Sequence, residues 1–253
     1  MAKWRLLYVA VPVAAAVLGL RYYVHNVLGI NELVSFGDAG PVITGAALIL
    51  GLMLSGVMGD YKESEKLPSA VAGSLSGFEG LAVRGLQLKD ADSSWVRPRI
   101  AKVAQAIDDW FYSRISDEEV GAATGDLNVM IVDLEKAGVP THYLARLFVS
   151  ASDLGGAVSR IQTIRNTNFI KSGYALMELL IAAVLGLMII VDFPSENVQW
   201  MVAGALSMVY VYMLLLVKDL DNPFGYGDNG GRGSAADVDL TPWITVAKNL
   251  GIR

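Results

Sequence analysis

The sequence has 253 residues, of which 53% are hydrophobic and 18% charged, and its net charge of −5 argues against nucleic acid as a partner. A soluble globular domain usually carries about 25% charged residues, so the low charge indicates a membrane protein. The absence of cysteine excludes disulfides and thiolate chemistry, and two histidines are too few for a multi-histidine metal centre.

The first predicted membrane span covers about residues 4–24. Its centre, Leu6–Leu20, carries no charge, and aromatic residues flank it as they do at membrane interfaces. A cleavable signal peptide is the alternative, because basic residues precede a short apolar stretch with small residues at 14–16. The run continues past these residues into Tyr22 and Tyr23, which favours a retained span.

The second predicted span, about residues 39–59, is uncharged and unusually rich in glycine, alanine and serine. Two interpretations stay open. Small residues allow membrane helices to pack closely, or they keep a lumen open while aliphatic side chains constrict it. The candidate pore-lining residues are Gly45, Ile49, Leu52, Met53 and Gly56.

Residues 61–170 predict a helical domain, because apolar residues recur there with the helical period. Ser116 and Glu119 have the spacing of a capping box at a helix start. No convincing strand alternation occurs, so the predicted fold class is all-α. The apolar stripes run over 100–111, 127–134 and 144–161, the last including Phe148.

Two more spans are predicted at about 172–191 and 198–217. Glu178 lies inside the third span, where a charge costs about 2.5–3.5 kcal/mol unless it is paired, protonated or facing water. It is therefore either an ion-pathway or proton-coupled group, or a carboxylate that reaches a neighbouring helix or Lys171. No nucleophile–base pair or metal-ligand spacing occurs, so we predict no catalytic residue, no metal site and no enzyme.

Arg160, Arg165 and Lys171 precede the third span and are expected to contact lipid headgroups. In an oligomer with a pore, they would instead raise the local anion concentration at its mouth. After the fourth span, a glycine-rich loop contains Gly225-x-Gly227-x-x-Gly230. This dinucleotide-binding spacing is accidental here, because it follows a membrane helix rather than a strand. A short helix from Thr241 to Leu250, begun by Thr-Pro, is expected to follow.

Basic residues are distributed asymmetrically. Of the 20 Lys and Arg, only Arg21 lies in the predicted loop 21–41, and 192–197 contains none. The positive-inside rule therefore places both termini and the helical domain in the cytoplasm, as in a multi-pass protein of a bacterial-type inner membrane. The predicted organisation begins with a membrane hairpin at residues 1–60, followed by a cytoplasmic helical domain at 61–170. A second membrane hairpin covers 171–218, and a cytoplasmic C-terminal segment covers 219–253.

From residue 160 onward, about 90 residues resemble the second half of bestrophins. The resemblance is carried by Arg160-Ile161-Gln162, Ser172-Gly173-Tyr174 and, after the second hairpin, Lys218-Asp219-Leu220-Asp221-Asn222-Pro223-Phe224-Gly225. The four-span topology with cytoplasmic termini agrees with that family. The resemblance implies a bestrophin-like, homo-oligomeric and pentameric channel in the lipid bilayer that passes chloride or other small anions through a pore lined by the second span.

The resemblance also assigns roles to the C-terminal motif. Asn222, Pro223, Phe224 and Gly225 would fix the cytoplasmic end of the fourth helix and take part in gating. Eukaryotic bestrophins bind calcium with an acidic run after this motif. Residues 226–230 here contain one acid, which disfavours calcium, the one cofactor that the resemblance suggests. The second span also lacks the family's bulky aromatic residues, so any constriction would be aliphatic.

Two other functions remain open on the sequence. A membrane scaffold that binds partners through its helical domain would use the second span for packing alone. A proton-coupled transporter would use Glu178.

Overall fold

The computed structural model describes residues 4–30, 33–166, 171–193, 195–226 and 236–252. They are almost entirely helical and divide into two compact units. The membrane unit comprises Met1–Tyr61, Asn168–Asn222 and Ser234–Ala236. The helical unit comprises Lys62–Thr167, Pro223–Gly233 and Asp237–Arg253.

Four stretches within the described ranges are long and apolar enough to cross a membrane. They are Arg5–Val27, Phe36–Gln87, Ser172–Ile190 and Val198–Leu220. The all-α class and the four predicted spans are therefore confirmed, and the protein is a multi-pass integral membrane protein.

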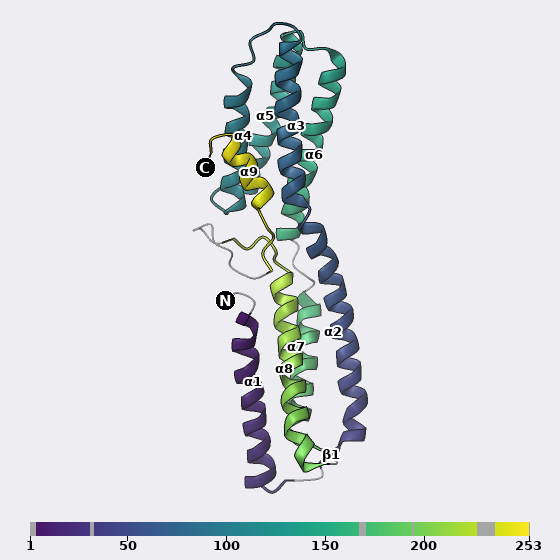
Figure 1. Ribbon diagram of the computed structural model, residues 1–253. Helices are drawn as coiled ribbons and strands as arrows, with labels where there is room; N and C mark the ends of the chain where they lie inside the picture. The colour runs from purple at the N-terminus through teal and green to yellow at the C-terminus, as the bar shows by residue number, and fades with distance from the viewer. Residues whose placement is uncertain (1–3, 31–32, 167–170, 194, 227–235, 253) are drawn as a thin grey trace. The chain divides into compact units, whose positions relative to one another are not determined.

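The membrane unit contains α1 (Arg5–Tyr22), which continues as a π-helical turn, η2 (Tyr23–Val27), and α2 (Phe36–Ser64), α7 (Lys171–Ile190) and α8 (Glu196–Leu220). Figure 1 shows α7 and α8 between α1 and α2. The helix α1 packs on α8 and α7. A Cβ at Gly204 of α8 would lie 3.2 Å from Leu18 Cδ1 of α1, so the glycine permits this close packing.

One face of α2 is buried against α7 and α8. Ala46, Leu50 and Val57 recur at helical spacing and pack in one cluster with Ile181 of α7 and Tyr210 of α8. The Tyr210 hydroxyl also donates a hydrogen bond of 2.5 Å to the carbonyl of Ile43. Because lipid is as apolar as leucine, close contact and hydrogen bonds, rather than escape from water, hold these helices together.

Two very short strands join loops at one end of the membrane unit. β1 (Val34–Ser35) precedes α2, and β2 (Val191–Asp192) follows α7. They pair in parallel, with Val34 opposite Val191. Sequence reasoning did not predict them, because two residues are too few to show an alternating pattern.

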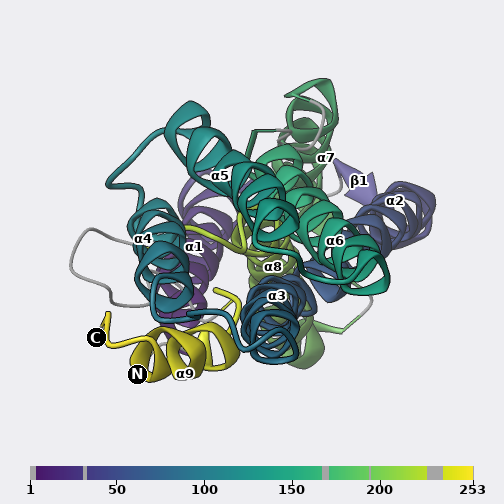
Figure 2. The ribbon, with the colours of Figure 1, turned by 90° about the horizontal axis from the view of Figure 1, so that it is seen from above.

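The helical unit contains α3 (Leu67–Gln87), α4 (Val96–Phe111), α5 (Asp117–Lys136), α6 (Thr141–Asn166) and α9 (Thr241–Asn249). The helix α3 packs along α6, and α9 lies against α3 and α4 (Figure 2). The predicted stripes of α4 and α5 are buried.

Two details of this unit were predicted with different success. The capping box of α5 is confirmed, with Ser116 accepting from the Glu119 backbone and the Glu119 side chain accepting from the Ser116 backbone. The α6 stripe was wrong at Phe148, whose side chain is 52% exposed. Leu147, which belongs to the same predicted stripe, is buried.

Candidate functional site

The face of α2 opposite its buried stripe is open in the single chain. Leu48 and Leu52 are about two-thirds exposed, at 65% and 67%, and Gly56 is exposed on the same side one turn further along. Because Leu48, Leu52 and Gly56 follow one another at intervals of four, they form one row along the helix.

The five predicted pore-lining residues are not all exposed in the single chain. Leu52 and Gly56 lie on the open face, whereas Gly45 and Ile49 are partly buried. Met53 packs against the cluster formed with α7 and α8. Its helical position, three residues after buried Leu50 and four before buried Val57, explains this placement.

The open face of α2 differs in composition from the exposed faces of α1 and α8. Thr44, Ser55 and Gly59 are exposed on α2. On α1 and α8 no serine or threonine is exposed among the described residues. Apart from Arg5 and Lys218, their exposed side chains are apolar and range from small, as in Ala15, to bulky, as in Tyr8 and Met201. The open α2 face is therefore suited to close approach of another copy or to contact with water.

Glu178 has a partner on the neighbouring helix. Lys218 Nζ of α8 donates to Glu178 Oε1 of α7 at 2.6 Å, and both side chains are about half exposed. One turn away, the Tyr174 hydroxyl donates to Asp221 Oδ2 at 2.6 Å. These four residues form a polar cluster that joins α7 to α8, here called the Glu178 cluster.

The Asn222–Gly225 motif lies where the chain passes from one unit to the other. Asn222 is the last residue of its segment of the membrane unit, and Pro223 the first of the next segment of the helical unit. Asn222 and Gly225 are exposed, whereas Pro223 and Phe224 are buried. The Val238 backbone N–H donates to the carbonyl of Pro223 at 2.9 Å, which fixes the turn within the helical unit.

Arg165 supports the same turn from α6. Its guanidinium donates to the carbonyls of Trp110 at 3.1 Å and Phe111 at 2.8 Å, and weakly to that of Phe224 at 3.5 Å. It also lies 4.8 Å from the centre of the Trp110 ring. Burial lowers the pKa of Arg165 from its usual value, with Asp117 acting in the opposite direction.

The expectation of lipid contacts for the basic residues before the third span is therefore wrong for Arg165, which satisfies carbonyls inside the helical unit. Arg160 is bound to Glu63 through two hydrogen bonds of 2.7 and 2.6 Å. The side chain of Lys171 lies outside the described residues, as does most of the segment 226–230 considered for calcium and for the dinucleotide spacing.

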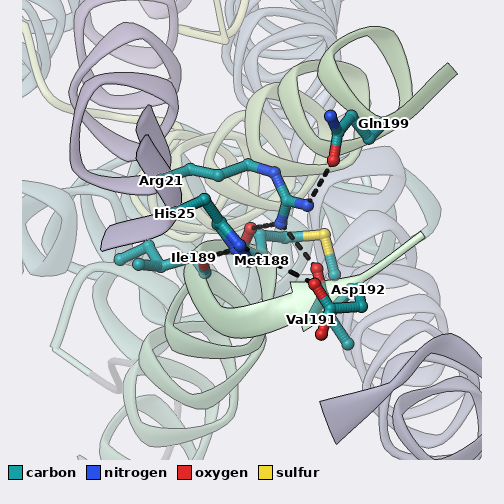
Figure 3. A network of polar contacts seen from close by, with 7 residues as sticks. All are labelled: Arg21, His25, Met188, Ile189, Val191, Asp192 and Gln199. Carbon is teal, nitrogen blue, oxygen red and sulfur yellow. Dashed lines mark hydrogen bonds and ion pairs between the residues drawn. The ribbon is translucent and has the colours of Figure 1, made fainter. Parts of the chain in front are cut away.

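Sequence reasoning missed a second polar centre, formed around Arg21 (Figure 3). The Arg21 side chain is fully buried in the membrane unit. It donates to the carbonyls of Met188 at 2.9 Å and Val191 at 2.7 Å, and to Gln199 Oε1 at 2.9 Å. Thus one guanidinium from α1 ties the end of α7, β2 and the start of α8 together.

His25 extends this network. Its Nε2 lies 3.1 Å from the Ile189 carbonyl, and its Nδ1 lies 3.7 Å from Asp192 Oδ1. Aromatic rings enclose the arginine, whose Cζ is 5.0 Å from the Phe193 ring centre and 6.0 Å from that of Trp200. We name Arg21, His25, Asp192 and Gln199 the Arg21 network.

Two signals in the sequence pointed to Arg21. It is the only lysine or arginine in the predicted loop 21–41. It also continues the buried stripe of α1 at intervals of three and four residues, after Ala10, Ala14 and Val17. A charged residue on the packed face of a membrane helix is expected to pair with buried polar groups of neighbouring segments.

No family model and no curated protein matches this sequence. Solved structures do match. A bacterial bestrophin homologue from Klebsiella pneumoniae is 15% identical, with a TM-score of 0.70, over 99% of this chain and 97% of the other. A single-substitution variant of that homologue gives 16% identity and a TM-score of 0.72 over 98% and 97%. A structure described as a membrane protein, also with one substitution, gives 16% and 0.69 over 98% and 97%.

Proposed function

Because this chain has the fold of the bacterial bestrophin homologues, we propose that it is an oligomeric channel passing chloride or other small anions through a central pore lined by α2. The observation that carries the proposal is the extent of the match, which covers 98–99% of the chain and includes all four candidate spans.

The open face of α2 supports this role. The α2 face offers the hydroxyl groups of Thr44 and Ser55 beside its leucines, whereas no serine or threonine is exposed on the described parts of α1 and α8. Hydroxyl and backbone groups tolerate water. Between them, aliphatic side chains from several subunits would form a hydrophobic constriction around the pore, and such constrictions can gate by dewetting. We assign the row Leu48, Leu52 and Gly56 to the lining and leave Met53 out of it.

A pore requires several copies of the chain. The helices α7 and α8 cover only one side of α2, so one chain does not enclose the open face. Cyclic symmetry would bring the same α2 face of each subunit to a common axis. We propose a homopentamer, as the bestrophin resemblance implies.

The middle of α2 is free of acids, although Asp38 and Asp60 lie near its two ends. Between Asp38 and Asp60 the helix carries no carboxylate, so no ring of acids would exclude chloride there. Thr44 and Ser55 are exposed and have hydroxyl donors that can solvate an anion. With cytoplasmic termini, as the basic residues indicate, the helical unit would face the cytoplasm.

Two measurements test the proposal. Native mass spectrometry of the detergent-solubilised protein should give five subunits, and a monomer would contradict a pore between subunits.

In planar bilayers, Leu52→Trp should remove most of the current by filling the lumen. Val9→Trp, on an exposed part of α1, is the matched control and should leave the current unchanged. An assembled protein without current would instead favour the scaffold.

A further inference from the structure

A groove runs between α3 and α6 on the surface of the helical unit, with a volume of about 440 Å³. Four polar side chains line it. Ser76 and Arg84 come from α3, and Arg146 and Ser150 come from α6. The volume lies within the range of about 300–1,000 Å³ that is usual for small-molecule sites.

Glycine keeps the groove open. A Cβ at Gly80 would meet nothing within 4 Å, and at Gly77 the nearest such atom would be Ser150 Oγ at 3.9 Å. At Gly85, by contrast, a Cβ would lie 2.7 Å from Val139 Cγ1. Thus the chain packs tightly at Gly85 and leaves room one to two turns earlier on α3.

The two arginines in the groove lack acidic partners. Within the described part of the chain, neither Arg84 nor Arg146 makes an ion pair, although both are exposed. Other arginines of the helical unit are neutralised, with Arg99 bound to Asp126 and Asp133, and Arg160 bound to Glu63. The groove therefore concentrates positive charge that the protein itself does not balance.

We propose that this groove binds the phosphate group of a small phosphate ester, with Arg84 and Arg146 as its two charged ligands. Guanidinium groups donate paired hydrogen bonds that match the oxygens of a phosphate. Ser76 and Ser150 supply further hydroxyl donors from the two helices.

The organic part of the ester would lie on an apolar wall. Leu81 of α3 and Val149 of α6 line the same groove, and the Val149 side chain is 60% exposed. Inorganic phosphate would leave this surface in water, so an ester gains apolar contact that the bare ion does not. The site is independent of the pore assignment, because none of its residues belongs to α2.

Isothermal titration calorimetry of the full-length protein in detergent tests the proposal, with glycerol 3-phosphate and inorganic phosphate as separate probes. Glycerol 3-phosphate should bind more tightly than inorganic phosphate. Arg84→Gln and Arg146→Gln should each weaken its binding by about tenfold or more, because each removes charge-assisted hydrogen bonds. The control Lys102→Gln, an exposed lysine on α4, should leave the affinity unchanged.

Both arginines are exposed and lack ion-pair partners, so the variants should keep the wild-type melting temperature. Three results would overturn the assignment: no heat from either probe, equal affinities for the two, or unchanged ester binding in the double arginine variant. A double variant that binds the ester normally but loses its oligomeric mass would show that the groove is a contact between subunits.

Discussion

Lys218 on α8 lies 2.6 Å from Glu178 on α7, so the one carboxylate predicted inside the third span is part of an ion pair between neighbouring helices. A neighbouring-helix partner was one of the alternatives that the sequence left open for this residue. The ion pair provides this partner, and the exposure of both side chains makes its contribution to stability small, about 0–1 kcal/mol.

Glu178→Gln should therefore leave channel conductance close to the wild-type value. The expected loss is limited to stability, by at most about 1 kcal/mol, because the pair is half exposed. Single-channel recording together with thermal unfolding checks both. A variant that folds normally but loses all transport would instead assign Glu178 to a proton-coupled mechanism. The exchange Glu178→Lys with Lys218→Glu is the control for charge alone.

Arg21→Met should destabilise the membrane unit by about 3 kcal/mol, because a buried charged donor to three acceptors is lost. Thermal unfolding in detergent measures the effect. Tyr23→Phe, an exposed neighbour in η2, is the control and should unfold as the wild type does. Equal melting temperatures for Arg21→Met and the wild type would contradict a structural role for the Arg21 network.

Much of the fold was predictable because it depends on local patterns. Hydropathy identified the four spans, and helical spacing identified the buried faces of α4 and α5. The Ser116 and Glu119 pair marked the start of α5. These features are set by residues within one or two turns of each other, so a single segment of sequence contains the signal.

The features that were missed depend on distant residues. Arg21 meets acceptors 167 and 170 positions away, at Met188 and Val191, which no local pattern contains. Met53 is one of the predicted lining residues, and its side chain packs against the cluster formed with α7 and α8, a contact that the sequence of α2 alone does not contain. Arg165 has the sequence position of a lipid anchor, but its guanidinium donates to the carbonyls of Trp110 and Phe111, more than 50 residues away.

Phe224→Ala should destabilise the helical unit by about 3–5 kcal/mol, as expected for removal of a fully buried aromatic side chain. Asn222→Ala, at an exposed position of the same motif, should change stability by no more than about 0.5 kcal/mol. Chemical unfolding of the two variants separates these effects. Equal stability of both would contradict an anchoring role for Phe224.

The capping box of α5 predicts a dependence of stability on pH. Hydrogen bonds from the Ser116 backbone and hydroxyl lower the pKa of Glu119. The stabilisation is therefore complete above the unfolded-state pKa of about 4.3 and is lost as pH falls through the lower folded-state value. The difference in melting temperature between wild type and Glu119→Gln should shrink as the pH is lowered from 7 to 3. A constant difference over this range would contradict the pKa shift.

The central claim, an anion channel, is tested most directly by the reversal potential of purified protein in planar bilayers with asymmetric KCl. The account predicts current that reverses near the chloride equilibrium potential. Reversal near the potassium equilibrium potential would contradict anion selectivity, and the absence of any current would contradict the channel itself.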